Sequence, residues 1–83
     1  MTHDNPKIDL ICQHCTDGRI IPIKFRVANE DGELQEVKVN GYKDVSEGGM
    51  LCLRCSVVIN NTARTVDIYT STIAGDGIWH VKM

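Results

Sequence analysis

Four cysteines are the residues in this sequence whose type and spacing fit a chemical role. They form two Cys-x2-Cys pairs, Cys12 with Cys15 and Cys52 with Cys55, and 36 residues lie between the pairs. Two such pairs are typical of a structural zinc site, in which four thiolates surround one Zn²⁺ at about 2.3 Å. Zinc would also stabilise a small fold by about 10 kcal/mol. The sequence therefore predicts a structural Zn²⁺ ion bound by Cys12, Cys15, Cys52 and Cys55.

Two features of the cysteine pairs count against a shared metal ion. Residues i and i+3 of a regular strand point to opposite faces, and Cys52 and Cys55 lie in a strand-like run. The interval between the pairs is longer than the roughly 15–20 residues of a compact zinc ribbon. Two alternatives stay open. The cysteines can be reduced and act as small hydrophobic residues, or Cys12 and Cys15 can form a redox switch.

Residue types that perform catalysis are present, but no motif arranges them for it. Ser, His and Asp do not occur in a pattern that supplies a nucleophile, a base and an orienting group. Gly48 and Gly49 are not followed by the Lys and the helix of a phosphate-binding loop. A zinc ion with four thiolate ligands has no open coordination position for a substrate. We therefore predict an interaction module that is not an enzyme.

Length and charge limit the class of protein. The chain has 83 residues and a net charge of -2, which fits one small domain and not a strongly basic binder. No apolar run exceeds four residues, whereas a membrane helix needs roughly 20 and a signal peptide about 7–15. We expect a cytoplasmic protein that does not bind membranes, with a flexible tail over residues 1–7 and a single β domain over residues 8–83.

The composition favours strands over helices. Val, Ile and Thr together supply 23 residues, whereas Leu and Ala supply only 7. β-Branched side chains lose rotamer freedom in a helix and fit a pleated sheet. The sequence predicts an all-β fold, either a small barrel or a zinc-ribbon-like bent antiparallel sheet, of about six short strands.

One predicted strand and the turns around it define the expected core. Residues 19–28 alternate in polarity, which predicts a core face made of Ile21, Ile23, Phe25 and Val27. Turn signals separate this strand from its neighbours and recur along the chain. They are Asp17-Gly18, Asp31-Gly32, Asn40-Gly41, Asn60-Asn61 and the run of residues 74–77.

Several stretches of the chain resemble a group of short uncharacterised proteins of Gram-positive bacteria. The similar stretches are CTDGRIIPIKFR at residues 15–26, DGE at 31–33, VKV at 37–39, CSVVIN at 55–60 and WHVKM at 79–83. The resemblance spans most of residues 15–83 and implies a compact β domain with no established activity. Cys15 and Cys55 match recurrent cysteines of the group, whereas Cys12 and Cys52 do not. The resemblance thus supports two of the four cysteines more than a complete zinc site.

The expected partner is another protein, and a nucleic acid is the less favoured partner. Basic side chains gather near the first predicted hairpin, at Arg19, Lys24, Arg26 and Lys38. Tyr42 and Tyr69 are the only aromatic residues placed to stack on bases. Acidic side chains nearby would cancel part of the positive field, at Glu30, Asp31, Glu33 and Glu36. A solvated surface is therefore favoured over a nucleic-acid site.

Overall fold

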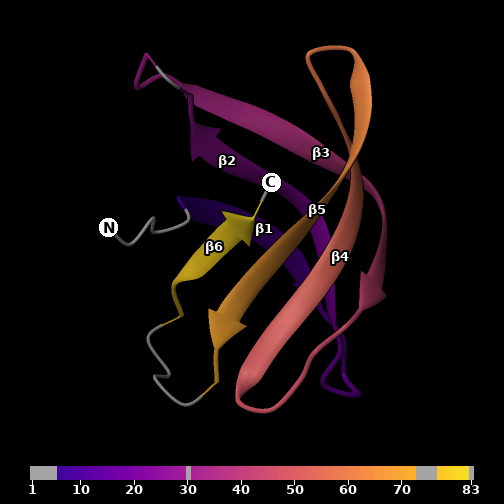
Figure 1. Ribbon diagram of the computed structural model, residues 1–83. Helices are drawn as coiled ribbons and strands as arrows, with labels where there is room; N and C mark the ends of the chain where they lie inside the picture. The colour runs from indigo at the N-terminus through magenta and orange to yellow at the C-terminus, as the bar shows by residue number, and fades with distance from the viewer. Residues whose placement is uncertain (1–5, 30, 73–76, 83) are drawn as a thin grey trace.

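The chain folds into a closed barrel of six antiparallel strands (Figure 1). The computed structural model describes residues 6–29, 31–72 and 77–82. The strands are β1 (Lys7–His14), β2 (Ile20–Ala28), β3 (Leu34–Asp44), β4 (Met50–Ile59), β5 (Thr62–Ser71) and β6 (Trp79–Lys82). Each strand pairs with the next along the chain, and β6 pairs with β1 to close the barrel. The predicted all-β small barrel is confirmed.

A single cluster of apolar side chains fills the barrel. Phe25, Leu53 and Ile68 are the largest of the side chains that are fully buried. Every strand contributes to the cluster through alternate residues, because successive side chains of a strand point to opposite faces. The buried members are Ile8, Phe25, Val27, Val37, Leu53, Cys55, Val57, Ile59, Val66, Ile68 and Val81. Most of them are β-branched, as the composition predicts.

The hairpin turns follow the residue types that the sequence supplies. Asn60 and Asn61 have φ values of 52° and 61° and form the two-residue turn between β4 and β5. Such turns need positive φ at both positions, which Asn tolerates better than most residues. Gly18 and Gly32 supply positive φ in the two earlier hairpin loops. The predicted turns at Asp17-Gly18, Asp31-Gly32 and Asn60-Asn61 are therefore confirmed.

A β-bulge in β2 reverses the predicted core face. Ile11 pairs with Lys24 and Cys12 pairs with Pro22, so Ile23 is an extra residue in the ladder. An extra residue inverts the alternation on one side of it. Pro22 is therefore buried, and the side chain of Ile23 is 42 % exposed. The core assignment of Phe25 and Val27 is confirmed and that of Ile23 is wrong, while Ile21 is only half-buried.

A second bulge replaces the turn predicted at Asn40-Gly41. Val39 pairs with Val57 and Gly41 pairs with Ser56, which leaves Asn40 as the extra residue of β3. The strand continues through both residues to Asp44. Asn and Gly mark turns and bulges alike, because both tolerate unusual backbone angles. The turn prediction at this position is wrong because β3 continues past Gly41 and stays paired with β4 as far as Asp44.

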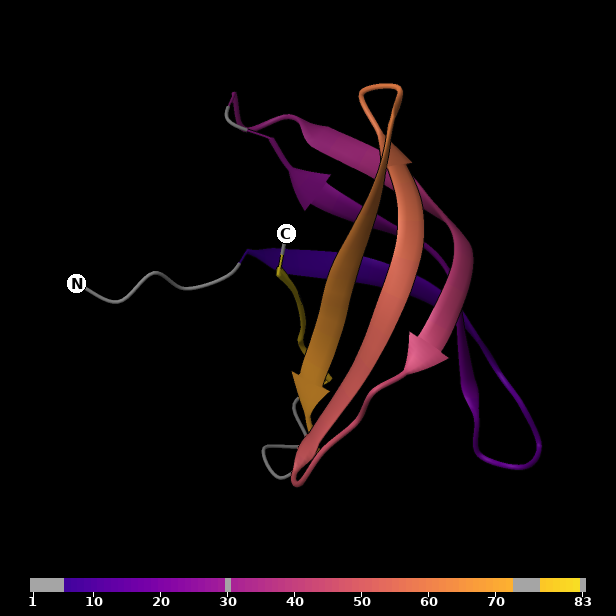
Figure 2. The same ribbon diagram turned by 45° about the vertical axis from the view of Figure 1, so that its right-hand side comes forward.

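β2 and β3 pair over only part of their length. Their ladder joins Lys24–Ala28 to Leu34–Lys38, and it contains no pair beyond Lys24 and Lys38 in the described residues. Past that point residues 20–23 of β2 and residues 39–44 of β3 diverge, and both bulges lie in these diverging stretches. Figure 2 shows the end of β3 following β4 while the β1–β2 hairpin projects away. We call the opening between these two stretches the seam.

The ends of the chain and one connection complete the comparison with the predictions. Lys7, placed in the flexible tail by the sequence, lies in β1 and pairs with His80. Residues 1–5 of that tail and residues 74–76 of the last predicted turn lie outside the described residues, whereas Gly77 has a φ of 70°. The described residues contain no helix that is long and apolar enough to span a membrane.

The bulge in β2 gives a first testable prediction. Ile68→Ala should lower the free energy of unfolding by about 2–5 kcal/mol, because Ile68 is fully buried and its truncation leaves a cavity. Ile23→Ala should lower it by less than about 1 kcal/mol, because the bulge turns Ile23 outward. Urea denaturation of both variants measures the difference. Equal losses would mean that Ile23 faces the core, as the simple alternation predicts.

Candidate functional site

Cys52 and Cys55 point to opposite sides of the barrel wall. β4 pairs with β5 without irregularity from Met50 to Ile59, so its alternation is regular. Cys55 is fully buried in the core, and its Sγ donates a hydrogen bond to the carbonyl oxygen of Leu53 at 3.6 Å. Cys52 is half-buried and lines a shallow outer hollow together with Arg54 and Asp67. One metal ion therefore cannot contact both thiols without a change in β4.

Cys12 and Cys15 lie on the other side of the barrel. Cys12 is half-buried on β1, and its Sγ is 3.6 Å from Nε2 of His14. Cys15 starts the loop to β2, where its N–H donates to the carbonyl oxygen of Arg19 at 2.9 Å. β1 and β4 are three strands apart in either direction around the barrel. The two Cys-x2-Cys pairs therefore belong to opposite walls.

The predicted ligands, as the structure places them, do not fit a shared zinc site. Within residues 6–29, 31–72 and 77–82, no group of three or more His, Cys, Asp or Glu side chains could hold a metal ion. A site with four thiolates needs all four sulfur atoms at about 2.3 Å from one centre. Opposite walls and opposite faces prevent that arrangement for Cys12, Cys15, Cys52 and Cys55.

The thiol pKa values favour inert cysteines. Burial raises the pKa of Cys55 to about 11, and the nearby charge of Asp67 acts in the same direction. Burial also raises the pKa of Cys12 and is the main cause of the raised pKa of Cys52. A redox dithiol works through a thiolate whose pKa is lowered. The raised pKa of Cys12 thus counts against the redox switch of Cys12 and Cys15.

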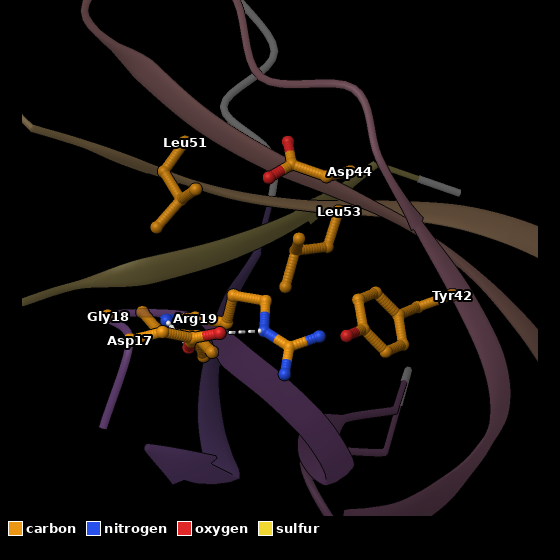
Figure 3. A pocket seen from close by; sticks show the side chains of 8 residues that line it. Asp17, Gly18, Arg19, Tyr42, Asp44, Leu51 and Leu53 are labelled. Carbon is orange, nitrogen blue, oxygen red and sulfur yellow. Dashed lines mark hydrogen bonds and ion pairs between the residues drawn. The ribbon is translucent and has the colours of Figure 1, made fainter. Parts of the chain in front are cut away.

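The seam opens into a cavity of about 270 Å³ (Figure 3). Leu51 and Leu53 of β4 and Ile20 of β2 supply its apolar wall. Tyr42 pairs with Cys55 and Asp44 pairs with Leu53. Residues directly opposite in a ladder share a face, so Tyr42 and Asp44 lie on the inner face at the opening. The cavity is thus the end of the barrel interior where the β2–β3 ladder is missing.

Polar groups at the rim of the cavity retain unused hydrogen-bonding capacity. Nε of Arg19 donates to Oδ2 of Asp17 at 2.7 Å, and the N–H of Arg19 donates to Oδ1 at 3.1 Å. Figure 3 shows the guanidinium extended toward Tyr42. In the part of the chain that the structure describes, the Nη atoms of Arg19 and the hydroxyl of Tyr42 have no hydrogen-bond partner. These groups are available to a ligand at the opening.

Asp44 contributes a fixed negative charge to the same rim. Its Oδ1 accepts a hydrogen bond from the N–H of Ser46 at 2.8 Å. Hydrogen bonds from Ser46 lower the pKa of Asp44, because they stabilise the carboxylate. The rim therefore presents a guanidinium, a phenol and a carboxylate above an apolar wall.

The sequence indicated this cavity only indirectly. The sequence indicates Arg19 and Tyr42 as possible nucleic-acid contacts and Asp17 only as part of a turn. It gives no functional signal for Asp44 or Leu51. Pro22 inside a strand and Asn40-Gly41 before another strand-like segment mark the two diverging stretches. Proline and glycine inside strands often mark bulges. That signal locates irregular backbone but not the cavity that the irregularity opens.

Comparisons with protein-family models, with curated proteins and with solved structures find no match to this chain. The resemblance to short proteins of Gram-positive bacteria is therefore not tested by these comparisons, and it stays a prediction.

The buried thiol gives a prediction about alkaline pH. The pKa of Cys55 is about 11 in the folded protein, against 9.0 for an unperturbed thiol. The unfolded chain therefore loses this proton first, and the free energy of unfolding should fall by about 2–3 kcal/mol as the pH rises from 9 to 11. Below pH 9 this loss is absent. Cys55→Ala should remove this component of the pH dependence, and Cys15→Ala should retain it. Denaturation at several pH values measures the effect, and identical profiles for the two variants would contradict it.

The zinc hypothesis is tested by metal analysis. We expect Cys52→Ser to leave the metal content and the melting temperature of the protein unchanged, because Cys52 faces away from Cys55. The protein is purified without added zinc, and the ratio of zinc to chain is measured by mass spectrometry. One zinc ion per chain that is lost in Cys52→Ser would instead support the site of four thiolates.

Proposed function

We propose that this protein is a non-catalytic binding module whose seam cavity takes one apolar side chain of a partner protein. The observation that carries the proposal is the missing part of the β2–β3 ladder, which gives access to the inner wall at Leu51 and Leu53. A cavity of about 270 Å³ lies just below the usual range of about 300–1,000 Å³ for small-molecule sites. This volume has room for one apolar side chain of a partner.

The residues at the cavity support binding over catalysis. Among the described residues, neither His nor Cys lines the cavity, so none of their thiols or imidazoles is placed to act on a bound group. Asp17 already holds Arg19, and Asp44 already accepts from Ser46. The ion pair thus orients the side chain of Arg19, and the hydrogen bond orients the side chain of Asp44.

Unmetallated cysteines fit this proposal. Cys55 lies opposite Tyr42 in the β3–β4 ladder, where its thiol fills the core beside the cavity. A reduced buried cysteine behaves as a small hydrophobic residue. The hypothesis of a structural zinc ion depends on the spacing of the cysteines alone, and the metal analysis described above decides between the two.

A leucine side chain with a blocked backbone tests the cavity. N-acetyl-leucinamide at millimolar concentration should shift the amide signals of Ile20, Tyr42 and Leu51 in ¹⁵N-edited NMR spectra. Leu51→Gln should weaken this binding by about tenfold, because it removes apolar contact from the cavity wall.

Val58→Gln is the matched control for Leu51→Gln. Val58 lies on the same strand, but its side chain faces outward and is 49 % exposed. Binding to Val58→Gln should equal binding to the unchanged protein. Shifts spread over the whole surface, or equal binding by both variants, would contradict a binding site in the cavity.

A further inference from the structure

We propose that the partner binds as an added strand on the free edge of β3 in the seam, and that this strand alternates apolar and acidic side chains. The inference depends on the proposed function, because the apolar side chains would enter the seam cavity. It adds the conformation of the partner and the chemistry of its outward face.

The free edge of β3 is the first observation. Across the described residues, 39–44 of β3 form a ladder only with β4, since the ladder with β2 ends at Lys38. An unpaired strand edge presents N–H and C=O groups that can pair with another chain. Six residues extend over about 20 Å at about 3.3 Å per residue, which is the length of an ordinary strand.

The inner face of the seam determines which side chains of the added strand are apolar. Tyr42 and Asp44 point inward, and the cavity lies beside them against Leu51 and Leu53. Inward side chains of an added strand would lie two residues apart over this cavity. One of them must be apolar to fill it.

The outer face of the seam determines which side chains of the added strand are acidic. Lys38 and Lys43 lie on the outer face of β3, and in the described residues neither has an ion-pair partner. Lys24, which pairs with Lys38 at the end of the β2–β3 ladder, forms an ion pair with Glu36 at 3.1 Å. Arg54, which pairs with Lys43, forms an ion pair with Asp67 at 3.0 Å. Glu36 and Asp67 are thus already engaged in ion pairs. Asp44 lies on the inner face of the seam, where the apolar side chains of the partner would enter. On the outer face, the two free lysines complement acidic side chains on an added strand.

Single-stranded nucleic acid would also be attracted to these lysines, but the aromatic residues do not support it. Tyr42 faces inward at the cavity. Tyr69 lies on β5, which is not adjacent to β3, and its ring stacks on His80 at a centroid distance of 5.4 Å. Bases bound along the lysines would therefore lack a row of aromatic side chains to stack on.

Blocked hexapeptides test the proposed pattern. One peptide alternates valine and glutamate, a second alternates valine and lysine, and a third has three valines followed by three glutamates. We expect only the first to bind, with NMR shifts centred on Gly41, Tyr42 and Lys43. The third peptide has the same charge and composition as the first, so the comparison isolates the alternation.

Charge reversal on β3 tests the electrostatic part. The double variant Lys38→Glu, Lys43→Glu should weaken binding of the valine–glutamate peptide by at least about fivefold and should favour the valine–lysine peptide. Lys82→Glu is the matched control, because Lys82 is exposed on β6, which lies three strands from β3 in either direction around the barrel. That variant should bind all three peptides as the unchanged protein does.

The results distinguish this inference from the proposed function. Equal binding of the first and third peptides would overturn strand addition, as would tighter binding of a thymidine decanucleotide than of any peptide. Binding of N-acetyl-leucinamide without binding of any peptide would overturn strand addition but would still support the binding site in the cavity. Peptide binding that Leu51→Gln does not weaken would overturn the entry of apolar side chains into the cavity.

Discussion

Closure of a six-stranded sheet around one layer of side chains is the constraint on which this structure depends. A barrel this narrow forces its strands to bend and coil strongly. β-Bulges concentrate such bending, and the chain has them at Ile23 in β2 and at Asn40 in β3. Both fall beyond the end of the ladder between these two strands. The bulges that accompany closure of the barrel therefore occur in the same two stretches that separate at the seam.

The same geometry explains the placement of the cysteines. β4 lies between two long ladders and keeps its regular alternation, so residues three apart diverge to opposite faces. Cys55 becomes part of the core and Cys52 part of the outer wall. A zinc knuckle bends the backbone sharply around its metal, and the continuous pairing of β4 opposes that bend. The Cys-x2-Cys spacing alone cannot distinguish a zinc knuckle from a regular strand, because it does not show which way each side chain points.

The seam brings together groups from distant parts of the sequence. Arg19 comes from the β1–β2 loop, Tyr42 and Asp44 from the end of β3, and Leu51 from the start of β4. Each polar group at the rim is fixed by a short-range hydrogen bond or lies in a ladder, which reduces the entropy lost when a ligand binds. Lys38 and Lys43 add positive charge on the outer face of β3 beside this opening. This arrangement is consistent with the proposed binding of a partner side chain.

The sequence by itself determined the all-β class, the number of strands and most turns, because β-branched composition and Asp-Gly or Asn-Asn pairs act locally. It also determined that Phe25 and Val27 face the core. Tertiary structure alone decided that Ile23 faces outward, that Asn40-Gly41 continues a strand, and that Cys52 and Cys55 separate. It likewise decided that the barrel opens at the seam. The physical reason is that a bulge shifts side chains by one residue only when a neighbouring strand fixes the register, and no local pattern contains that neighbour.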